Sequence, residues 1–122
     1  MLNLFKKKSR VADLSALGVD MHSHLLPGID DGAQNLEEST ELILGLKALG
    51  YRKLITTPHI YSEYYPNTKT TIQDAHDRLR RHLDQKGIEI EIEAAAEYFM
   101  DEHFEELLQN NQLLTFGKNY VL

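Results

Sequence analysis

Extended apolar segments alternate with amphipathic helical segments from residue 18 to the end of the sequence. The predicted strands cover residues 18–24, 52–57 and 88–98, and residues 118–122 resemble the beginning of a fourth strand. The predicted helices cover residues 35–50, 70–87 and 101–111. Strands that alternate with helices form parallel sheets joined by right-handed crossovers. The sequence therefore predicts an α/β fold with parallel strands.

The first two helices are predicted from the spacing of their apolar residues. In the first helix the apolar stripe consists of Leu36, Ile43, Leu46 and Leu49. In the second helix it consists of Ile72, Ala75, Leu79 and Leu83. Asn35 and Glu38 suit a capping box at the first helix start, and Gly50 and Gly87 suit the two helix ends.

The charge and composition exclude several classes of protein. The chain of 122 residues has 19 acidic and 13 basic side chains, and its net charge of -6 argues against affinity for nucleic acid or anionic membranes. It has no cysteine, so any metal site must use imidazole and carboxylate ligands. No apolar segment is long enough to span a bilayer or to act as a secretory signal. We therefore expect a cytoplasmic protein without stable membrane insertion.

Residues 1–17 are predicted to be an N-terminal extension that precedes one α/β domain at residues 18–122. Three consecutive lysines, Lys6 to Lys8, lie in this extension near several apolar residues. Such a segment can touch a membrane surface or a partner, but a solvated terminus is the commoner outcome.

Side chains that can bind a metal ion follow each predicted strand. The stretch "DMHSHLLPGIDDG", residues 20–32, contains two histidines in the first strand and two aspartates in the loop after it. The carboxyl ends of parallel strands face one crevice, so residues at successive strand ends should converge there. The candidate ligands at these positions are His22, His24, Asp31, His59 and Glu97.

The ligand types indicate which ions such a site would bind. Residues i and i+2 of a strand project to the same face, about 6.5 to 7 Å apart, so His22 and His24 can turn onto one ion. Imidazole together with carboxylate suits manganese, iron and zinc. A cluster of such ions would clamp a phosphate oxygen and make a hydroxide nucleophile near neutral pH.

Each candidate also has an ordinary structural interpretation. An H-x-H pair occurs often by chance, and Asp30 and Asp31 are typical of a turn in which Gly32 takes the left-handed position. A histidine after a proline, such as His59, is common in plain loops. Glu97 differs, because a carboxylate within the apolar segment "AAAEYF" is costly to bury without a cation or a donor. The joint occurrence at successive strand ends favours the metal centre.

The remaining histidines are predicted to lie outside the site. His76 and His82 belong to a helix of mixed charge, which is typical of a solvated face, and His103 lies in an acidic helix. Neither a Ser-His-Asp pattern nor a glycine-rich phosphate loop is present, so covalent catalysis is unsupported.

Three segments resemble a known family: "DMHSHLLPGIDDGAQNLEESTELI", "LITTPH" and "AAAEYF". Together they resemble the polymerase and histidinol phosphatase (PHP) superfamily. More narrowly they are similar to the bacterial manganese-dependent protein-tyrosine phosphatases of capsular and exopolysaccharide operons, the CpsB/CapC type. The run "HSHLLPGIDDGA" is highly specific to that branch, and the similarity extends over nearly all of Gly18 to Leu122.

The resemblance implies a distorted TIM-like barrel that holds metal ions at its strand ends and hydrolyses phosphotyrosine with a metal-activated water. By this resemblance His22 and His24 bind the first ion, Asp31 and His59 serve another, and Glu97 is a further ligand. Asp30 fits the motif less closely than Asp31. The implied cofactor is manganese, with iron, zinc and cobalt as alternatives. The implied partner is the phosphorylated tyrosine-rich tail of a cognate polysaccharide-chain kinase.

The sequence departs from this family in length. A (β/α) barrel needs about 250 residues, so this chain supplies roughly half of one. The later motifs expected of the family are absent: a glutamate on the fourth strand, a histidine followed by a phosphate-binding arginine, and a D-x-H pair. We therefore expect residues 18–122 to be the N-terminal half of a PHP-type metallophosphoesterase domain, weakly active or inactive alone. An uncovered sheet edge would be prone to association, which leaves a homo-oligomer open.

Two other functions stay open at this stage. One is another PHP-type phosphoesterase that acts on a small phosphate monoester, and the other is a non-catalytic fragment that binds metal or a partner. Tyr61, Tyr64 and Tyr65 bear on the choice, since they could receive an aromatic phosphoester or simply pack within their own loop.

Overall fold

The computed structural model describes residues 10–122, and the lysine cluster Lys6 to Lys8 lies outside the described residues. The strands are β1 (Val19–Asp20), β2 (Lys53–Thr56), β3 (His59–Ile60), β4 (Glu91–Ala94) and β5 (Glu97–Tyr98). The helices are α1 (Leu36–Ala48), α2 (Lys69–Gln85) and α3 (Glu102–Gln109). All pairs of these strands are parallel, in the orders β1-β2-β4 and β3-β5. The predicted α/β class with parallel strands is confirmed.

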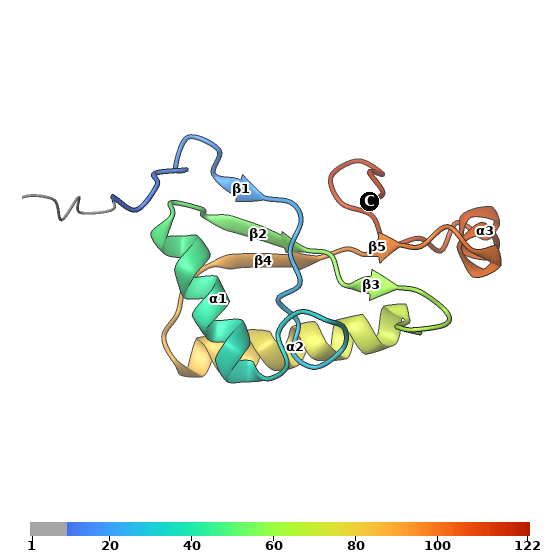
Figure 1. Cartoon of the computed structure of the whole chain (residues 1–122), viewed down its shortest axis with the longest axis horizontal. Coiled ribbons are helices and arrows are strands. Elements are labelled where there is room, and N and C mark those ends of the chain that lie inside the picture. Colours follow the sequence, from blue (N-terminus) through green and yellow to red (C-terminus); the bar gives the residue numbers. More distant parts are fainter. Residues whose placement is uncertain (1–9) are drawn as a thin grey trace, which may run out of the picture.

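Strand β3 continues β2, and β5 continues β4, so the two-stranded sheet extends the β2–β4 pair of the three-stranded sheet (Figure 1). Thr56 pairs with Ala94 at the end of β2–β4, and His59 pairs with Glu97 at the start of β3–β5. Between them, Ala95 N–H donates to Thr56 O at 2.9 Å and Glu97 N–H donates to Pro58 O at 2.9 Å. Pro58 has no N–H to donate, which explains the interruption of the ladder at this point.

Helices α1 and α2 lie on one side of the three-stranded sheet (Figure 1). Leu54 and Ile92 are neighbours in register and belong to the core cluster that includes the apolar stripe of α2. The buried residues of this stripe are Ile72, Ala75, Leu79 and Leu83, as predicted. In α1, Ile43 is completely buried, and Asn35 caps the helix by accepting a hydrogen bond from Glu38 N–H.

The face of the sheet away from the helices carries charge. Because Ile92 faces the helices, Glu91 and Glu93 project to the opposite face of β4. Lys53 of β2 lies there 3.0 Å from a Glu91 oxygen and 2.6 Å from a Glu93 oxygen. These hydrogen bonds, first to Glu93 and then to Glu91, raise the pKa of Lys53.

The extended segments differ from their predicted limits. The strand predicted over 18–24 ends at Asp20, since the next residues bond to side chains and backbone at the end of β2 instead of continuing the ladder. The loop predicted after residue 57 contains β3 and a bridge between Tyr61 and Tyr65. The strand predicted over 88–98 is divided into β4 and β5.

The prediction of a fourth strand at residues 118–122 was wrong, because the structure has no strand there. An antiparallel bridge between Phe116 and Tyr120 closes a turn there, and both backbone hydrogen bonds of this bridge measure 3.0 Å. The segment reaches β5 through one bond, from Tyr98 N–H to Leu122 O at 3.1 Å. A single bond does not make a strand ladder.

The prediction that His76 and His82 are surface residues was also wrong. His76 lies under the edge of β4, where its Nε2–H donates to Ile92 O at 2.9 Å, and only 18% of its side chain is exposed. His82 Nε2 is buried as well. The mixed charges along α2 suggested a solvated face, but both histidines lie next to residues of its apolar stripe.

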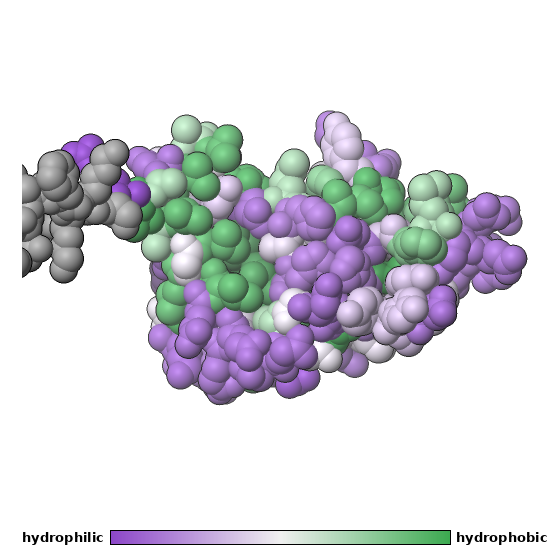
Figure 2. Space-filling view, in the orientation of Figure 1, coloured by the Kyte–Doolittle hydropathy of each residue, from purple (hydrophilic) through white to green (hydrophobic). Residues whose placement is uncertain are grey.

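The surface seen in Figure 2 is mixed, with hydrophobic residues gathered over part of α1 and near β1 and with hydrophilic residues around them. Exposed apolar side chains include Leu42 and Leu44 of α1. Among the described residues, no helix has both the length and the apolar character needed to cross a bilayer.

Gly32 allows the loop after β1 to fold back on itself. Ala33 N–H donates to His24 O at 3.1 Å, and this brings Gly32 against the same residue. A Cβ atom on Gly32 would lie 2.2 Å from His24 O and 2.3 Å from His24 Cβ. The glycines with left-handed φ do not include Gly32, so the predicted left-handed role was wrong. The glycine is needed for close backbone approach.

Substituting Gly32 by alanine should therefore destabilise the chain by about 1 to 3 kcal/mol, because the backbone must move to relieve the overlap. Urea unfolding followed by circular dichroism measures this change. The matched control is Gly45→Ala in α1, where an added Cβ meets no atom within 4 Å and should stabilise the helix by about 1 kcal/mol. Equal free energies of unfolding for the two variants would contradict this explanation of Gly32.

Candidate metal centre

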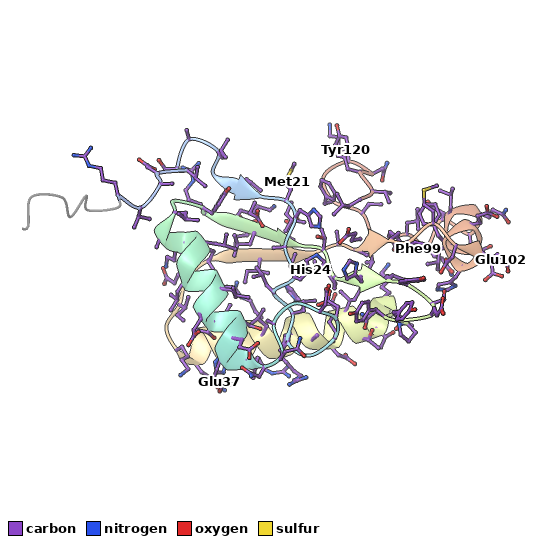
Figure 3. All side chains as sticks on the ribbon, in the orientation of Figure 1. Met21, His24, Glu37, Phe99, Glu102 and Tyr120 are labelled. Atoms are coloured by element: carbon purple, nitrogen blue, oxygen red, sulfur yellow. The ribbon has the colours of Figure 1, made fainter. Side chains whose placement is uncertain are left out.

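The segment after β1 carries His22 and His24, and it is anchored to the end of β2 by hydrogen bonds of the neighbouring residues Ser23 and Leu25. Ser23 O accepts from Thr57 N–H at 2.7 Å and from the Thr56 hydroxyl at 2.9 Å, and Leu25 N–H donates to Thr56 Oγ1 at 2.9 Å. His22 and His24 flank Ser23 in this anchored segment, and their ring centroids lie 5.5 Å apart. Figure 3 places His24 where β2 and β4 continue into β3 and β5.

His59 and Glu97 are brought together by strand pairing. They are the first residues of β3 and β5 and are direct partners in the parallel register. His59 Nδ1 lies 3.3 Å from Glu97 Oε2. The ring of His59 also approaches that of His24, with centroids 4.6 Å apart.

Three imidazoles converge on one oxygen atom of Glu97. Glu97 Oε2 lies 3.2 Å from His22 Nε2, 3.2 Å from His24 Nε2 and 3.3 Å from His59 Nδ1. The Glu97 side chain is 30% exposed, so the cluster faces a crevice and is not sealed in the core. The convergence expected at successive strand ends is thus found for these four residues.

Asp31 joins the cluster from the loop after β1. Its Oδ1 lies 3.2 Å from His59 Nε2, and its side chain is 59% exposed. Two sets of donor atoms, each within 4.8 Å of one another, result from these contacts. One set is His22, His24 and Glu97, and the other is His24, Asp31 and His59. All five predicted ligands therefore lie in one place.

The spacing of these atoms fits the coordination of a divalent ion. For a metal-to-ligand distance of about 2.1 Å, neighbouring ligand atoms are about 3.0 Å apart in an octahedron and about 3.4 Å apart in a tetrahedron. The separations of 3.2 and 3.3 Å between nitrogen and oxygen atoms fall between these values. Imidazole and carboxylate ligands without thiolate suit manganese, iron or zinc. The two sets share His24, and a neutral imidazole has one free lone pair, so His24 can bind one ion at a time.

Two buried side chains that sequence reasoning did not assign support the cluster. Asp30 has 1% of its side chain exposed and contacts His24 Nδ1 at 2.9 Å. Asn67 donates from Nδ2 to Ile29 O at 2.8 Å and to His59 O at 2.9 Å, which ties the loop after β1 to β3. The adjacent aspartates of "DDG" were a signal for Asp30, whereas Asn67 had none.

Aromatic rings border the cluster on the side of β3. A cavity of about 190 Å³ is lined by two candidate ligands and four aromatic residues: His59, Glu97, Tyr61, Tyr65, Tyr98 and Phe99. Tyr65 stacks on His59 with ring centroids 5.4 Å apart, and Tyr61 stacks on Phe99 at 4.2 Å. Burial is the main cause that raises the pKa of Tyr61, followed by the nearby charge of Glu63.

Asp101 holds this aromatic hairpin against α3. It accepts from the Ser62 hydroxyl at 2.8 Å and from Phe104 N–H at 2.9 Å as the N-cap of the helix. The bond from Phe104 N–H is the main cause that lowers the pKa of Asp101, followed by the bond from Ser62.

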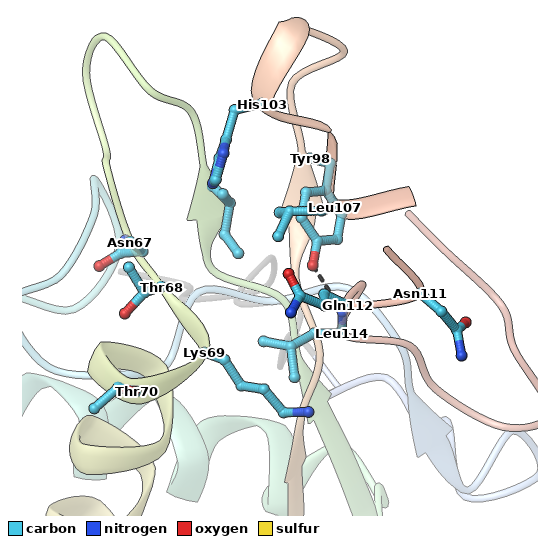
Figure 4. Close-up of a pocket in the computed structure, with 11 residues that line it drawn as sticks. Asn67, Thr68, Lys69, Thr70, Tyr98, His103, Leu107, Asn111, Gln112 and Leu114 are labelled. Atoms are coloured by element: carbon cyan, nitrogen blue, oxygen red, sulfur yellow. Dashed lines mark hydrogen bonds between the residues drawn. The ribbon is translucent and has the colours of Figure 1, made fainter. Parts of the chain in front are cut away.

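A second cavity, of about 360 Å³, lies between the start of α2 and α3 (Figure 4). Its lining includes Lys69, Tyr98, His103 and Leu114, and Leu114 N–H donates to Tyr98 Oη at 2.7 Å. None of the five candidate ligands lines it, so it is separate from the metal cluster.

Comparison with known proteins gives a consistent result. The family model described as "Capsular polysaccharide synthesis, CpsB/CapC" matches residues 18–122. The tyrosine-protein phosphatase YwqE of Bacillus subtilis is 30% identical over 105 residues, which cover 85% of this chain and 41% of YwqE. CapC of Staphylococcus aureus is 22% identical over 95 residues, which cover 78% of this chain and 37% of CapC.

A solved structure supports the same relationship. Crystallographic work on YwqE from Bacillus subtilis and CpsB from Streptococcus pneumoniae describes them as unique metal-dependent tyrosine phosphatases. A chain from that work superposes with a TM-score of 0.71 and 31% identity, over 80% of this chain and 39% of that chain. This chain thus spans about two fifths of the relatives that it matches. Its sequence, fold and matched range show that it belongs to the CpsB/CapC family of capsular polysaccharide synthesis.

Proposed function

We propose that this chain is the N-terminal part of a metal-dependent protein-tyrosine phosphatase that regulates the synthesis of capsular polysaccharide or exopolysaccharide. The observation that carries the proposal is the convergence of three imidazoles on Glu97 Oε2 with Asp31 beside them. The family membership and the metal-dependent tyrosine phosphatases among the relatives support the reaction type.

In this proposal His22, His24, Asp31, His59 and Glu97 hold divalent ions, with manganese as the native metal. Bound ions of this kind would polarise a phosphate ester and lower the pKa of water near it. The chain's own contribution is to fix the ligands: β3 and β5 set His59 opposite Glu97, and the Thr56 hydroxyl sets the segment that carries His22 and His24.

The proposal extends to the whole domain. The parallel order β1-β2-β4 with α1 and α2 on one side is compatible with an arc of a distorted TIM-like barrel. We propose that residues 18–122 form the N-terminal half of such a barrel and that the missing half supplies further ligands and the group that grips the phosphate. The 41% share of YwqE that this chain matches supports this division.

The proposed substrate is phosphotyrosine in the tail of a polysaccharide-chain tyrosine kinase, and the proposed location is the cytoplasm, which suits a chain without cysteine. The aromatic cavity beside His59 and Glu97 supports an aryl phosphate over an alkyl one. Rings prefer to stack on or against other rings, so a phenyl group can lie there while its phosphate reaches the cluster.

The protein encoded by the parent gene, loaded with manganese, should hydrolyse a phosphotyrosine peptide and should lose this activity when the metal is removed with a chelator. Manganese should restore it. The 122-residue chain alone should bind manganese, but it should hydrolyse the phosphotyrosine peptide much more slowly than the parent protein does. Absence of phosphotyrosine hydrolysis by the manganese-loaded parent protein would refute the proposal, and turnover of histidinol phosphate in its place would favour the small-monoester alternative.

Replacing Glu97 by glutamine should lower kcat/KM of the parent protein by at least about 100-fold, because the residue on which three imidazoles converge loses its charge. The matched control is Glu102→Gln at the exposed start of α3, which should retain wild-type kinetics. Wild-type activity in Glu97→Gln would show that the reaction does not depend on this cluster.

Replacing Tyr65 by alanine should raise KM for a phosphotyrosine peptide roughly 5- to 10-fold, because a stacked aromatic pair contributes about 1 kcal/mol. KM for an alkyl phosphate monoester should change much less. Tyr120→Ala, at a ring that stacks on Phe116 outside this cavity, serves as the control. If the Tyr65 variant changes both KM values equally, the cavity does not select aryl groups.

A further inference from the structure

The Asp30 carboxylate is the most completely buried charge near the cluster, with 1% of its side chain exposed. Burying an ionised carboxylate is costly unless donors surround it. Asp30 Oδ2 accepts from His59 N–H at 3.0 Å and lies 2.9 Å from His24 Nδ1, and Asp30 Oδ1 accepts from Gly32 N–H at 3.0 Å. Each of these contacts reaches a segment that carries a candidate ligand.

We propose that Asp30 is a positioning residue: it holds His24 in the tautomer that has its proton on Nδ1 and its free electron pair on Nε2, and it fastens the loop of Asp31 to β3. The inference rests on the proposed function only where it concerns the bound ion. The role of Asp31 as a ligand and the role of Asp30 as a support are thereby assigned to adjacent residues of "DDG".

The tautomer follows from the chemistry of the contact between His24 and Asp30. An ionised carboxylate can only accept hydrogen bonds. The 2.9 Å contact with Asp30 Oδ2 has hydrogen-bond geometry, whereas the 3.2 Å contact of His24 Nε2 with Glu97 Oε2 does not, so the proton of a neutral His24 lies on Nδ1. A neutral imidazole with a proton on Nδ1 has its lone pair on Nε2. His24 Nε2 is the atom that lies 3.2 Å from Glu97 Oε2, on the side where an ion would bind. A carboxylate behind a metal-binding histidine is a common means of fixing its orientation.

The backbone contacts give Asp30 a second effect. Gly32 N–H and His59 N–H point at its two oxygens from different segments of the chain, the loop after β1 and the start of β3. Asp31 lies between Asp30 and Gly32, and it faces His59 Nε2 at 3.2 Å. One buried carboxylate therefore fixes the relative positions of His24, Asp31 and His59.

Asparagine cannot reproduce this pattern, although it has nearly the same shape. Both carboxylate oxygens face a backbone N–H, one from His59 and one from Gly32. The amide of asparagine has one acceptor oxygen and one NH₂ group, so in either orientation a donor meets a donor. If the NH₂ group faces His24, the Nδ1 atom of His24 must accept the hydrogen bond, and the ring proton moves to Nε2. Either result disturbs the cluster.

The tautomer is testable on the metal-free 122-residue chain. Long-range ¹H–¹⁵N correlation spectra of chain with labelled histidine distinguish protonated from unprotonated ring nitrogens, and the His24 signals are assigned from their loss in His24→Gln. At about pH 8, where an ordinary imidazole is neutral, His24 should carry its proton on Nδ1. A proton on Nε2 with none on Nδ1 of wild-type His24 would overturn the proposal, and this result needs no Asp30 variant to fold.

Variants separate the positioning role from ligation. Asp30→Ala, which removes both acceptor oxygens, should lose the preference of His24 for the Nδ1–H tautomer. It should also bind Mn²⁺ about 10- to 100-fold more weakly, measured by titration with detection of free Mn²⁺ by electron paramagnetic resonance, and Asp30→Asn should weaken binding whichever way its amide turns. Asp31→Asn should also weaken Mn²⁺ binding but keep the tautomer. Asp77→Asn, at an exposed carboxylate of α2, should change neither.

The outcomes also distinguish this inference from the proposed function. If the wild-type chain binds no Mn²⁺ yet His24 carries its proton on Nδ1 and loses that preference in Asp30→Ala, the proposed metal is wrong and the positioning role stands. If a folded Asp30→Ala retains both the tautomer and the wild-type affinity for Mn²⁺, the positioning role is wrong.

Discussion

Three imidazole nitrogens lie within 3.3 Å of one carboxylate oxygen, and the candidate site depends on this contact. The fold holds these side chains together, since none of the histidines is adjacent to Glu97 in sequence. Parallel strands provide the means, because their carboxyl ends lie at one edge of the sheet. The register that pairs His59 with Glu97 is thus as important for the site as the identity of either residue.

The candidate ligands, which are partly exposed, depend on buried polar residues. Thr56 bonds the segment of Ser23 and Leu25, whereas Asp30 and Asn67 each bond two separate segments around the cluster. Removing one partner from such a buried network leaves unpaired donors or acceptors, which costs more than the lost bond itself. The apolar core of α1, α2 and the sheet stabilises the fold, whereas this polar layer fixes the geometry at its edge.

Much of this architecture was predictable from sequence. Helical spacing identified the buried stripe of α2. The strand-end positions of His22, His59 and Glu97 predicted that these candidate ligands would lie together, because period and topology are encoded locally. The end of the second strand before Pro58 was predicted, but its continuation as β3 and the division of β4 from β5 were missed, since a strand that kinks but keeps its partner has the same residue pattern as a continuous one. The role of Asn67 depends on a contact 38 residues away, which no local pattern reveals.

We propose that these residues form a binding site for divalent ions. Anomalous X-ray diffraction at the manganese absorption edge, from crystals of the chain grown with Mn²⁺, tests this site most directly. We expect an anomalous peak in coordination contact with His24 Nε2 and Glu97 Oε2, with His22 or His59 completing the shell. Ordered manganese bound elsewhere, with these side chains bonded to each other and no peak among them, would contradict it.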